Sequence, residues 1–247
     1  MYKFKQILIL DLKNLFTNPM WMFYAVGFPI ALVLILGFLT SGGYGGTVSS
    51  YDYYGVAFMI FSIFNAATFS ANSFMEERIK KPNMRLVHSP VRPFYIHFSK
   101  VLASFIFCTV AYTAVALFFV LTVGVNYGGV NVWAPLLIML VSLFFFSSLG
   151  VTVCCLLQSE GITNNILSLL FALFAILGGL FFPIEGLGKA VVAVSWASPA
   201  KWILTACLRI IYDNDFSMFL PVCGLFVILS IASLALCSRS FRGEDYI

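Results

Sequence analysis

One polar segment, residues 76–100, lies between two strongly apolar regions and restricts what this chain can fold into. It reads EERIKKPNMRLVHSPVRPFYIHFSK and holds six of the fourteen Lys and Arg residues. Because each Lys or Arg at the centre of a bilayer costs about 2.5–3.5 kcal/mol on insertion scales, no lipid-facing helix can carry this run. The segment is therefore predicted to lie outside the hydrocarbon, on the cytoplasmic side that basic loops favour.

The rest of the chain has too few charged residues to cover the surface of a soluble protein. Of its 247 residues only 10% are charged and 61% are hydrophobic, with a mean hydropathy of +0.99. Soluble domains carry roughly 25% charged residues. We therefore predict an all-α polytopic membrane protein. The net charge of +4 lies in membrane-flanking segments and does not indicate a nucleic-acid partner. The six cysteines lack the spacing of metal ligands, so no metal site is predicted.

Six apolar stretches are long enough to cross about 30 Å of hydrocarbon. Before them, residues 3–18 alternate polar and apolar positions with a helical period, which predicts a helix lying in the membrane interface. Gly27 and Pro29 predict a kink in the first span. In the fourth, the small residues of SSLG, Ser147 to Gly150, allow close helix approach. The six spans are expected over residues 21–39, 54–75, 101–123, 135–157, 165–182 and 217–237.

Residues 183–216 are apolar enough to pass for a seventh span, and the distribution of charge decides against it. With six spans, eleven Lys and Arg residues face the cytoplasm and only three face outward, as the positive-inside rule requires. Pro199, Lys201 and Arg209 also argue against a full crossing. We predict a re-entrant hairpin of two short helices, at 188–196 and 199–212, and place both termini in the cytoplasm.

The second span is the most polar. Ser62, Asn65, Thr68 or Phe69, and Asn72 recur three or four residues apart, share one helical face and continue to Glu76. In a bilayer this face must contact protein or water. Two interpretations remain equally open: hydrogen bonding between helices, or the lining of a substrate path.

At the end of the fifth span, Gly178 and Gly179 permit close backbone approach. Together with the outer end of the first span, they are predicted to form the contact with a second copy.

The order of these elements resembles the membrane subunit of a type-2 ABC exporter over essentially the whole chain. An interfacial helix precedes six spans, a basic loop joins the second span to the third, and F-P-I-E at 182–185 leads into a proline-punctuated hairpin. Two positions depart from the family pattern: Gly188 stands where a proline is frequent, and residues 81–83 replace a Gly-Thr pair. The matching residues are Pro183, Glu185, Ser198, Pro199 and Arg209 in the hairpin region, and Glu76, Glu77, Arg78, Ser89, Pro90 and Lys100 in the basic loop.

The resemblance implies one permease domain over residues 1–247, with a cytoplasmic coupling loop at 76–100 and the hairpin at 183–216. Two such subunits, identical or paralogous, would pair in the membrane of a bacterial cell above two soluble ATPase subunits. ATP and Mg would belong to those ATPases, because this chain lacks a G-x-x-x-x-G-K-[ST] motif. The residues expected to contact the ATPase are Glu76, Glu77, Arg78, Arg85, Leu86, His88, Ser89 and Pro90.

The expected function is ATP-driven export of an apolar or amphipathic substrate, such as a lipid-like molecule, a drug or an antimicrobial peptide. An ATP-independent secondary transporter or channel is the alternative, although the chain has no evident internal repeat. The basic loop also has a simpler interpretation, in which it contacts anionic headgroups and orients the protein.

Overall fold

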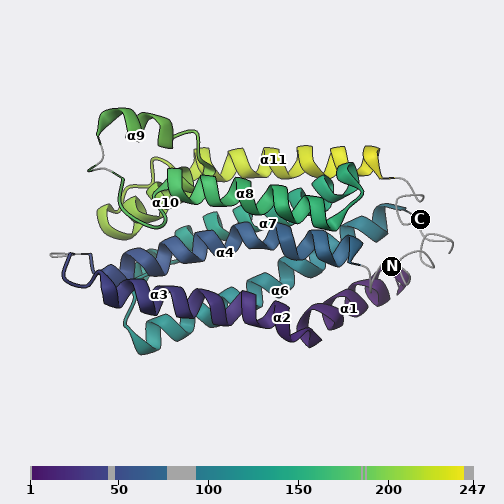
Figure 1. Ribbon diagram of the computed structural model, residues 1–247, viewed down its shortest axis with the longest axis horizontal. Coiled ribbons are helices and arrows are strands. Elements are labelled where there is room, and N and C mark those ends of the chain that lie inside the picture. The colour runs from purple at the N-terminus through teal and green to yellow at the C-terminus, as the bar shows by residue number, and fades with distance from the viewer. Residues whose placement is uncertain (1, 44–47, 77–92, 185, 187, 242–247) are drawn as a thin grey trace.

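In the computed structural model, residues 2–43, 48–76, 93–184, 186 and 188–241 are described. They form a bundle of helices aligned along one axis (Figure 1). Six segments of these residues are long and apolar enough to cross a membrane, as predicted. They are Pro19–Leu39, α4 (Ser50–Met75), α6 (Pro93–Thr122), α7 (Trp133–Leu157, preceded by the short turn η2, Gly129–Asn131), α8 (Glu160–Gly178) and α11 (Phe219–Ser240).

The helix α4 lies at the centre of the bundle and is the most buried of the six spans. It packs against α3, α6, α7 and α8. Phe64 of α4 contacts both α7 and α8. The centre of its ring lies 4.6 Å from that of Phe146 on α7 and 5.3 Å from that of Phe171 on α8. A capping box between Ser49 and Asp52 fixes the start of α4. The most polar span is therefore also the one most shielded from lipid.

The close helix approach predicted for the fourth span is observed at Gly150, which packs against α4. A Cβ atom added to Gly150 would lie 1.9 Å from the carbonyl oxygen of Ala67 on α4. On its other side α7 meets α11, where Thr152 and Ser233 share a hydrogen bond of 2.9 Å between their hydroxyls. Small residues thus bring α4, α7 and α11 together, as in other membrane helix pairs.

The first span consists of three segments: α2 (Pro19–Met22), the π-helical turn η1 (Phe23–Gly27) and α3 (Phe28–Leu39). Pro29 has no N–H to donate to the preceding turn, and a π turn is one way to absorb that loss. The π turn lies at the place where Gly27 and Pro29 predict a kink, and the kink itself stays a prediction. Before it, α1 (Tyr2–Thr17) lies along the first turns of α6 (Figure 1).

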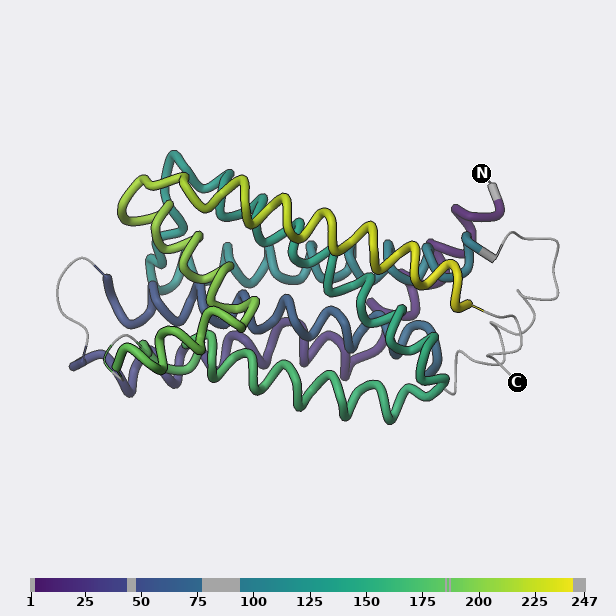
Figure 2. Tube along the Cα trace, turned by 90° about the horizontal axis from the view of Figure 1, so that it is seen from above, coloured from purple at the N-terminus to yellow at the C-terminus, as the bar shows by residue number. Residues whose placement is uncertain are grey.

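The segment between the fifth and sixth spans returns to the end of the bundle from which it started. It holds α9 (Lys189–Ser195), α10 (Pro199–Leu208) and the π turn η4 (Arg209–Asp213), with a bend of 102° between α9 and the rest. Figures 1 and 2 show α8 ending and α11 beginning at this same end, which we call the hairpin end. The opposite end, which holds α1 and the first turns of α6, is called the α1 end. The six-span topology with a bent helix pair is thus confirmed.

Three boundaries differ clearly from the prediction: both ends of the fifth span and the start of the third. The fifth span begins at Glu160 and not near residue 165, because the hydroxyl of Ser159 accepts the amide of Ile162 and caps the helix. It ends at Gly178, because Gly179 adopts φ +80°. The predicted loop 76–100 is also shorter, since α6 begins at Pro93, a favoured first helical residue.

Candidate functional site

One strip of α4 remains open between α3 and α8. Phe61, Asn65 and Thr68 are partly exposed, whereas nearly all of their neighbours on this helix are buried. Their spacing of four and three residues places them on one face. Figure 1 shows α4 between α3 on one side and α8 on the other. We call these three residues the α4 strip; it combines an aromatic ring, an amide and a hydroxyl along a membrane-spanning helix.

The four residues predicted for the substrate path do not all lie on this strip. Asn65 lies on it, and its amide donates to the carbonyl of Phe61 at 3.4 Å. Ser62, Phe69 and Asn72 are at most 4% exposed. Sequence reasoning missed Phe61, because a phenylalanine in an apolar span carries no signal of its exposure.

The three buried residues hold α4 to its neighbours. The carbonyl of Ser62 accepts the hydroxyl of Tyr112 on α6 at 2.5 Å. Asn72 accepts the amide of Asn164 on α8 at 2.7 Å. Phe69 packs edge-on against the ring of Trp21 and against that of Phe107. Helix–helix bonding is therefore observed at Ser62 and Asn72, while the substrate path stays a prediction that Asn65 fits best.

A buried ion pair attaches α1 to α6 at the α1 end. Lys100 donates to one carboxylate oxygen of Asp11, and Ser99 donates to the other at 2.9 Å. Both charged side chains are at most 2% exposed. The ring of Phe4 adds a contact with that of Phe98, 6.0 Å away. The assignment of Lys100 to the basic loop is therefore wrong, because Lys100 forms a contact between two helices. Sequence reasoning missed this ion pair because Asp11 lies 89 residues away.

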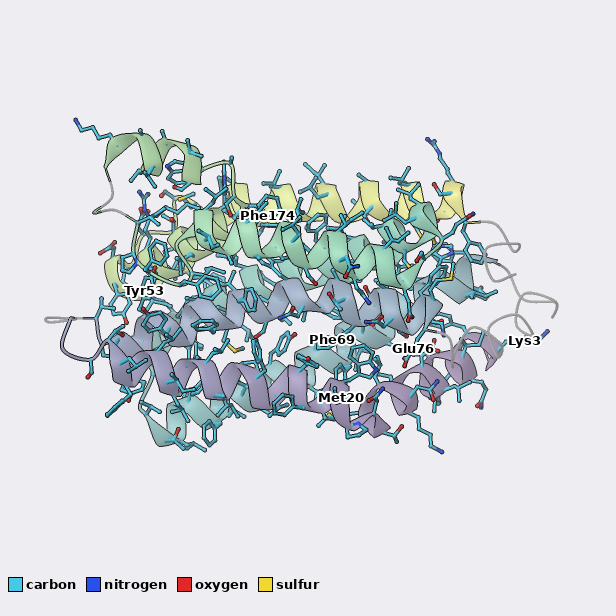
Figure 3. The ribbon with its side chains drawn as sticks, viewed as in Figure 1. Lys3, Met20, Tyr53, Phe69, Glu76 and Phe174 are labelled. Atoms are coloured by element: carbon cyan, nitrogen blue, oxygen red, sulfur yellow. The ribbon has the colours of Figure 1, made fainter. Side chains whose placement is uncertain are left out.

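A hollow of about 640 Å³ lies between the end of α1, α2 and the last turn of α4. Asn14, Trp21, Ser73 and Glu76 are among its lining residues. Glu76 ends α4, and its N–H donates to the carbonyl of Asn72 at 2.8 Å. Figure 3 places Glu76 at the α1 end and Tyr53 at the hairpin end of the same helix. The other predicted coupling residues lie outside the described residues: Glu77, Arg78, Arg85, Leu86, His88, Ser89 and Pro90.

At the hairpin end, two tyrosines of α4 hold the turn that follows α8. The hydroxyl of Tyr53 donates to the carbonyl of Gly179, and that of Tyr54 donates to the carbonyl of Phe181 at 3.0 Å. Gly178 is buried as well, and a Cβ atom there would lie 2.4 Å from that of Ala200 on α10. The close approach that these glycines permit is therefore made within the chain, and their contact with a second copy stays a prediction.

The hairpin is fixed to α8 by a cap. Ser198 caps α10, with Pro199 as its first residue, and donates its hydroxyl to the carbonyl of Phe174 at 2.6 Å. A second hollow, of about 610 Å³, lies against the hairpin and includes Pro183, the buried Lys201 and Arg209 in its lining. Glu185 lies outside the described residues.

The turn after the hairpin carries an exposed ion pair. Arg209 lies 3.5 Å from the carboxylate of Asp215. The backbone and hydroxyl of Ser217 also donate to this carboxylate, and they lower the pKa of Asp215 more than Arg209 does. These contacts fix a surface turn. Among the described residues, no group of three or more His, Cys, Asp or Glu side chains could hold a metal ion.

Comparison with known proteins gives one finding that covers most of the chain. The sequence model of the ABC-2 type transporter family matches residues 2–212. This range holds α1, the first five spans and the hairpin as far as Tyr212, and therefore the whole α4 strip. No curated protein matches the chain.

Proposed function

This chain belongs to the ABC-2 type transporter family, and from that premise we propose that it is the membrane subunit of an ATP-driven exporter. As a member it is a multi-pass membrane component of a transporter and not itself the catalytic ATPase. The proposed cargo is an apolar or amphipathic molecule, such as a lipid-like compound, a drug or an antimicrobial peptide. The proposed direction is outward across a bacterial inner membrane.

The α4 strip is the observation that carries this proposal. Asn65 and Thr68 offer hydrogen-bonding groups beside the ring of Phe61, so the strip can contact both parts of an amphipathic molecule. The face continues toward Glu76 and the hollow at the α1 end. Polar groups on a membrane-spanning helix that are partly exposed and not buried against a neighbour indicate a pathway.

The proposed partners follow from the family and the charge distribution. Two soluble ATPases, which carry ATP and Mg, dock on the α1 end through the segment that contains Leu86 and Arg85. That end faces the cytoplasm, together with both termini. A second copy, or a paralogous subunit, packs in the membrane so that two α4 strips face one another and are shielded from lipid.

Proteoliposomes that contain the chain and its co-purified ATPase test this function. Two probes are suitable: a phospholipid with a fluorescent headgroup and a hydrophobic cationic dye. ATP-dependent outward movement of at least one probe is expected. Asn65→Leu and Thr68→Val should each reduce that movement about tenfold or less, in line with the loss of one hydrogen bond. Binding of the ATPase should not change.

The matched control is Thr122→Val, which removes a hydroxyl from the exposed end of α6, where it bonds only its own helix. Probe movement in this variant should equal that of the unmodified protein. Equal transport by all three variants would contradict the α4 strip as the path. Movement without ATP or ATPase would favour the alternative of a secondary transporter or channel.

A further inference from the structure

A lateral slot opens on the side of α4 opposite the α4 strip. It has a volume of about 220 Å³ and lies between α6 and α7, toward the hairpin end. Met59 and Ile63 of α4 form its floor. Counted at 100° per residue, these two positions lie about 160° and 200° around the helix from Phe61. The lining used below also includes Leu117 and Val120 of α6 and Leu136 and Met139 of α7, and we call the site the α6–α7 slot.

The mouth of the slot is continuous with the lipid-facing surface. Leu117, Val120 and Leu136 are 57%, 45% and 48% exposed, whereas Met59 and Ile63 on the floor are 5% and 2% exposed. The lining residues are uncharged. The hydroxyl of Tyr112 in the wall is already bonded to the carbonyl of Ser62. The hydroxyls of Thr109 and Tyr127 likewise donate to the carbonyls of Phe105 and Gly55. The slot therefore presents mainly carbon atoms to hydrocarbon.

We propose that this slot holds one acyl chain of a membrane phospholipid from the leaflet at the hairpin end. An unfilled groove would forfeit dispersion contacts along its walls, and a flexible chain can follow its shape. Pockets for drug-sized ligands are typically about 300–1,000 Å³, so a slot of this size suits a slender group. Continuity with the bilayer supplies that group directly.

The negative charge of Asp52, near the hairpin end of the slot, favours one type of lipid headgroup. Residues 123–132, which join α6 to α7, contain no Lys or Arg. The carboxylate of Asp52 lies against this turn and accepts the amide of Asn126 at 2.8 Å. Tyr127, the next residue, lines the slot. A headgroup with an ammonium, as in phosphatidylethanolamine, fits this surface, whereas the net negative charge of phosphatidylglycerol is repelled.

The lipid in the α6–α7 slot also contacts α4, on the side opposite the α4 strip. Its tail would lie against Met59 and Ile63, while Phe61 and Asn65 face the other way. This inference is independent of the cargo and of its direction, because it concerns a resident lipid and not the transported molecule.

Retention of phospholipid by the purified protein complex tests the proposal. The complex is extracted in mild detergent with an equal mixture of phosphatidylethanolamine and phosphatidylglycerol, washed, and examined by native mass spectrometry. One phosphatidylethanolamine per chain is expected. Ala116→Phe fills the slot from α6 and Leu136→Trp blocks its mouth from α7. Each should lower retention about tenfold, which corresponds to about 1.4 kcal/mol.

Two matched controls lie beside these positions. Ala114→Phe and Leu137→Trp make the same changes at exposed residues that do not line the slot, and both should retain the lipid. Using two slot variants keeps the test valid if one of them fails to fold. Equal retention by slot and control variants would overturn the proposal. So would a slot occupied by a segment of another protein, which would leave no retained phospholipid in the unmodified complex. Equal retention of both lipids would overturn the headgroup assignment.

Discussion

Gly150 shows how much a single hydrogen atom can matter in this bundle. Its backbone approaches α4 so closely that any side chain would collide with the carbonyl of Ala67. Gly224 on α11 offers a contrast, because a Cβ atom there meets nothing within 4 Å. Of these two glycines within membrane-spanning helices, only Gly150 is needed for close packing.

Gly150→Ala should lower stability by about 1–3 kcal/mol, the usual cost of overpacking, because α4 and α7 must move apart. Gly224→Ala should cause no loss, since alanine favours a helix over glycine. The measurement is thermal unfolding in detergent of both variants and the unmodified protein. Equal melting temperatures for the two variants would show that the close contact with Ala67 is not needed.

The exposed Asp215 predicts a pH effect limited to acid. Hydrogen bonds from Ser217, with a smaller effect of Arg209, hold its pKa below the ordinary value of 3.8. A carboxylate with a depressed pKa stabilises the fold above its ordinary value, and this contribution disappears as the pH falls through the folded value. Hydrogen exchange at the Ser217 amide should thus show constant protection from about pH 5 to 8, with loss only in stronger acid. Asp215→Asn should remove the acid-dependent loss; an unchanged profile would exclude this carboxylate as its source.

Among the elements, α1 packs closely against the start of α6. The ion pair of Asp11 and Lys100 is buried between them, and aromatic rings extend the contact on both sides. α6 begins directly after residues 77–92, the segment proposed to dock the ATPase. A movement of that segment would therefore move α1 and α6 together.

Lys100→Met should destabilise the protein by about 3–5 kcal/mol, because it leaves the Asp11 carboxylate buried without its cation. Adding Asp11→Leu should recover much of that loss, since an apolar pair can replace a buried ion pair. Thermal unfolding of both single variants and the double variant gives the coupling energy. Strictly additive losses would mean that the two side chains do not stabilise each other.

Leu86→Asp, with one lysine added elsewhere in the basic loop, tests docking against simple charge. The net charge is kept, so insertion and topology should remain. Binding of the ATPase should weaken, because a carboxylate would be buried at an apolar contact. Co-purification of the ATPase and its ATP hydrolysis are the measurements. If both stay normal, the loop acts through its charge alone.

The elements differ in how far the sequence could predict them. The spans follow from apolar length and the hairpin from charge counting, because the bilayer imposes both on local sequence. The pairing of Asp11 with Lys100 depends on contact between distant segments, which no local pattern contains. Gly178 could be recognised as a site of close approach, but not its partner, since Ala200 of the same chain and a second copy both satisfy that pattern.

At the scale of the whole molecule, the two ends of the bundle contain different structural features. The α1 end gathers the ion pair and the last turn of α4, and the hairpin end holds the two tyrosines and the folded-back helices (Figure 1). Between them, α3 and α8 lie on either side of α4, and each carries exposed apolar residues (Figure 1). A second copy facing this side would enclose both strips.

Cysteines at Phe38 on α3 and Ile176 on α8 should therefore crosslink between two copies. These side chains are 71% and 48% exposed, and both lie toward the hairpin end. Leu121→Cys, on α6 and 83% exposed, is the control and should not crosslink. Gel analysis after mild oxidation, in a Cys223→Ser background, gives the answer. Crosslinking through Leu121 in place of Phe38 and Ile176 would assign the interface to the opposite face.

The separation of Asp11 from Lys100 in the sequence also affects the order in which the segments can pack during synthesis. The two residues are 89 positions apart, so the first two spans are synthesised before the lysine is made. Until then Asp11 has no cation to enter a buried site with, and its carboxylate must remain in water. We therefore expect α1 to stay at the membrane surface during synthesis and to dock on α6 only after the third span has been inserted.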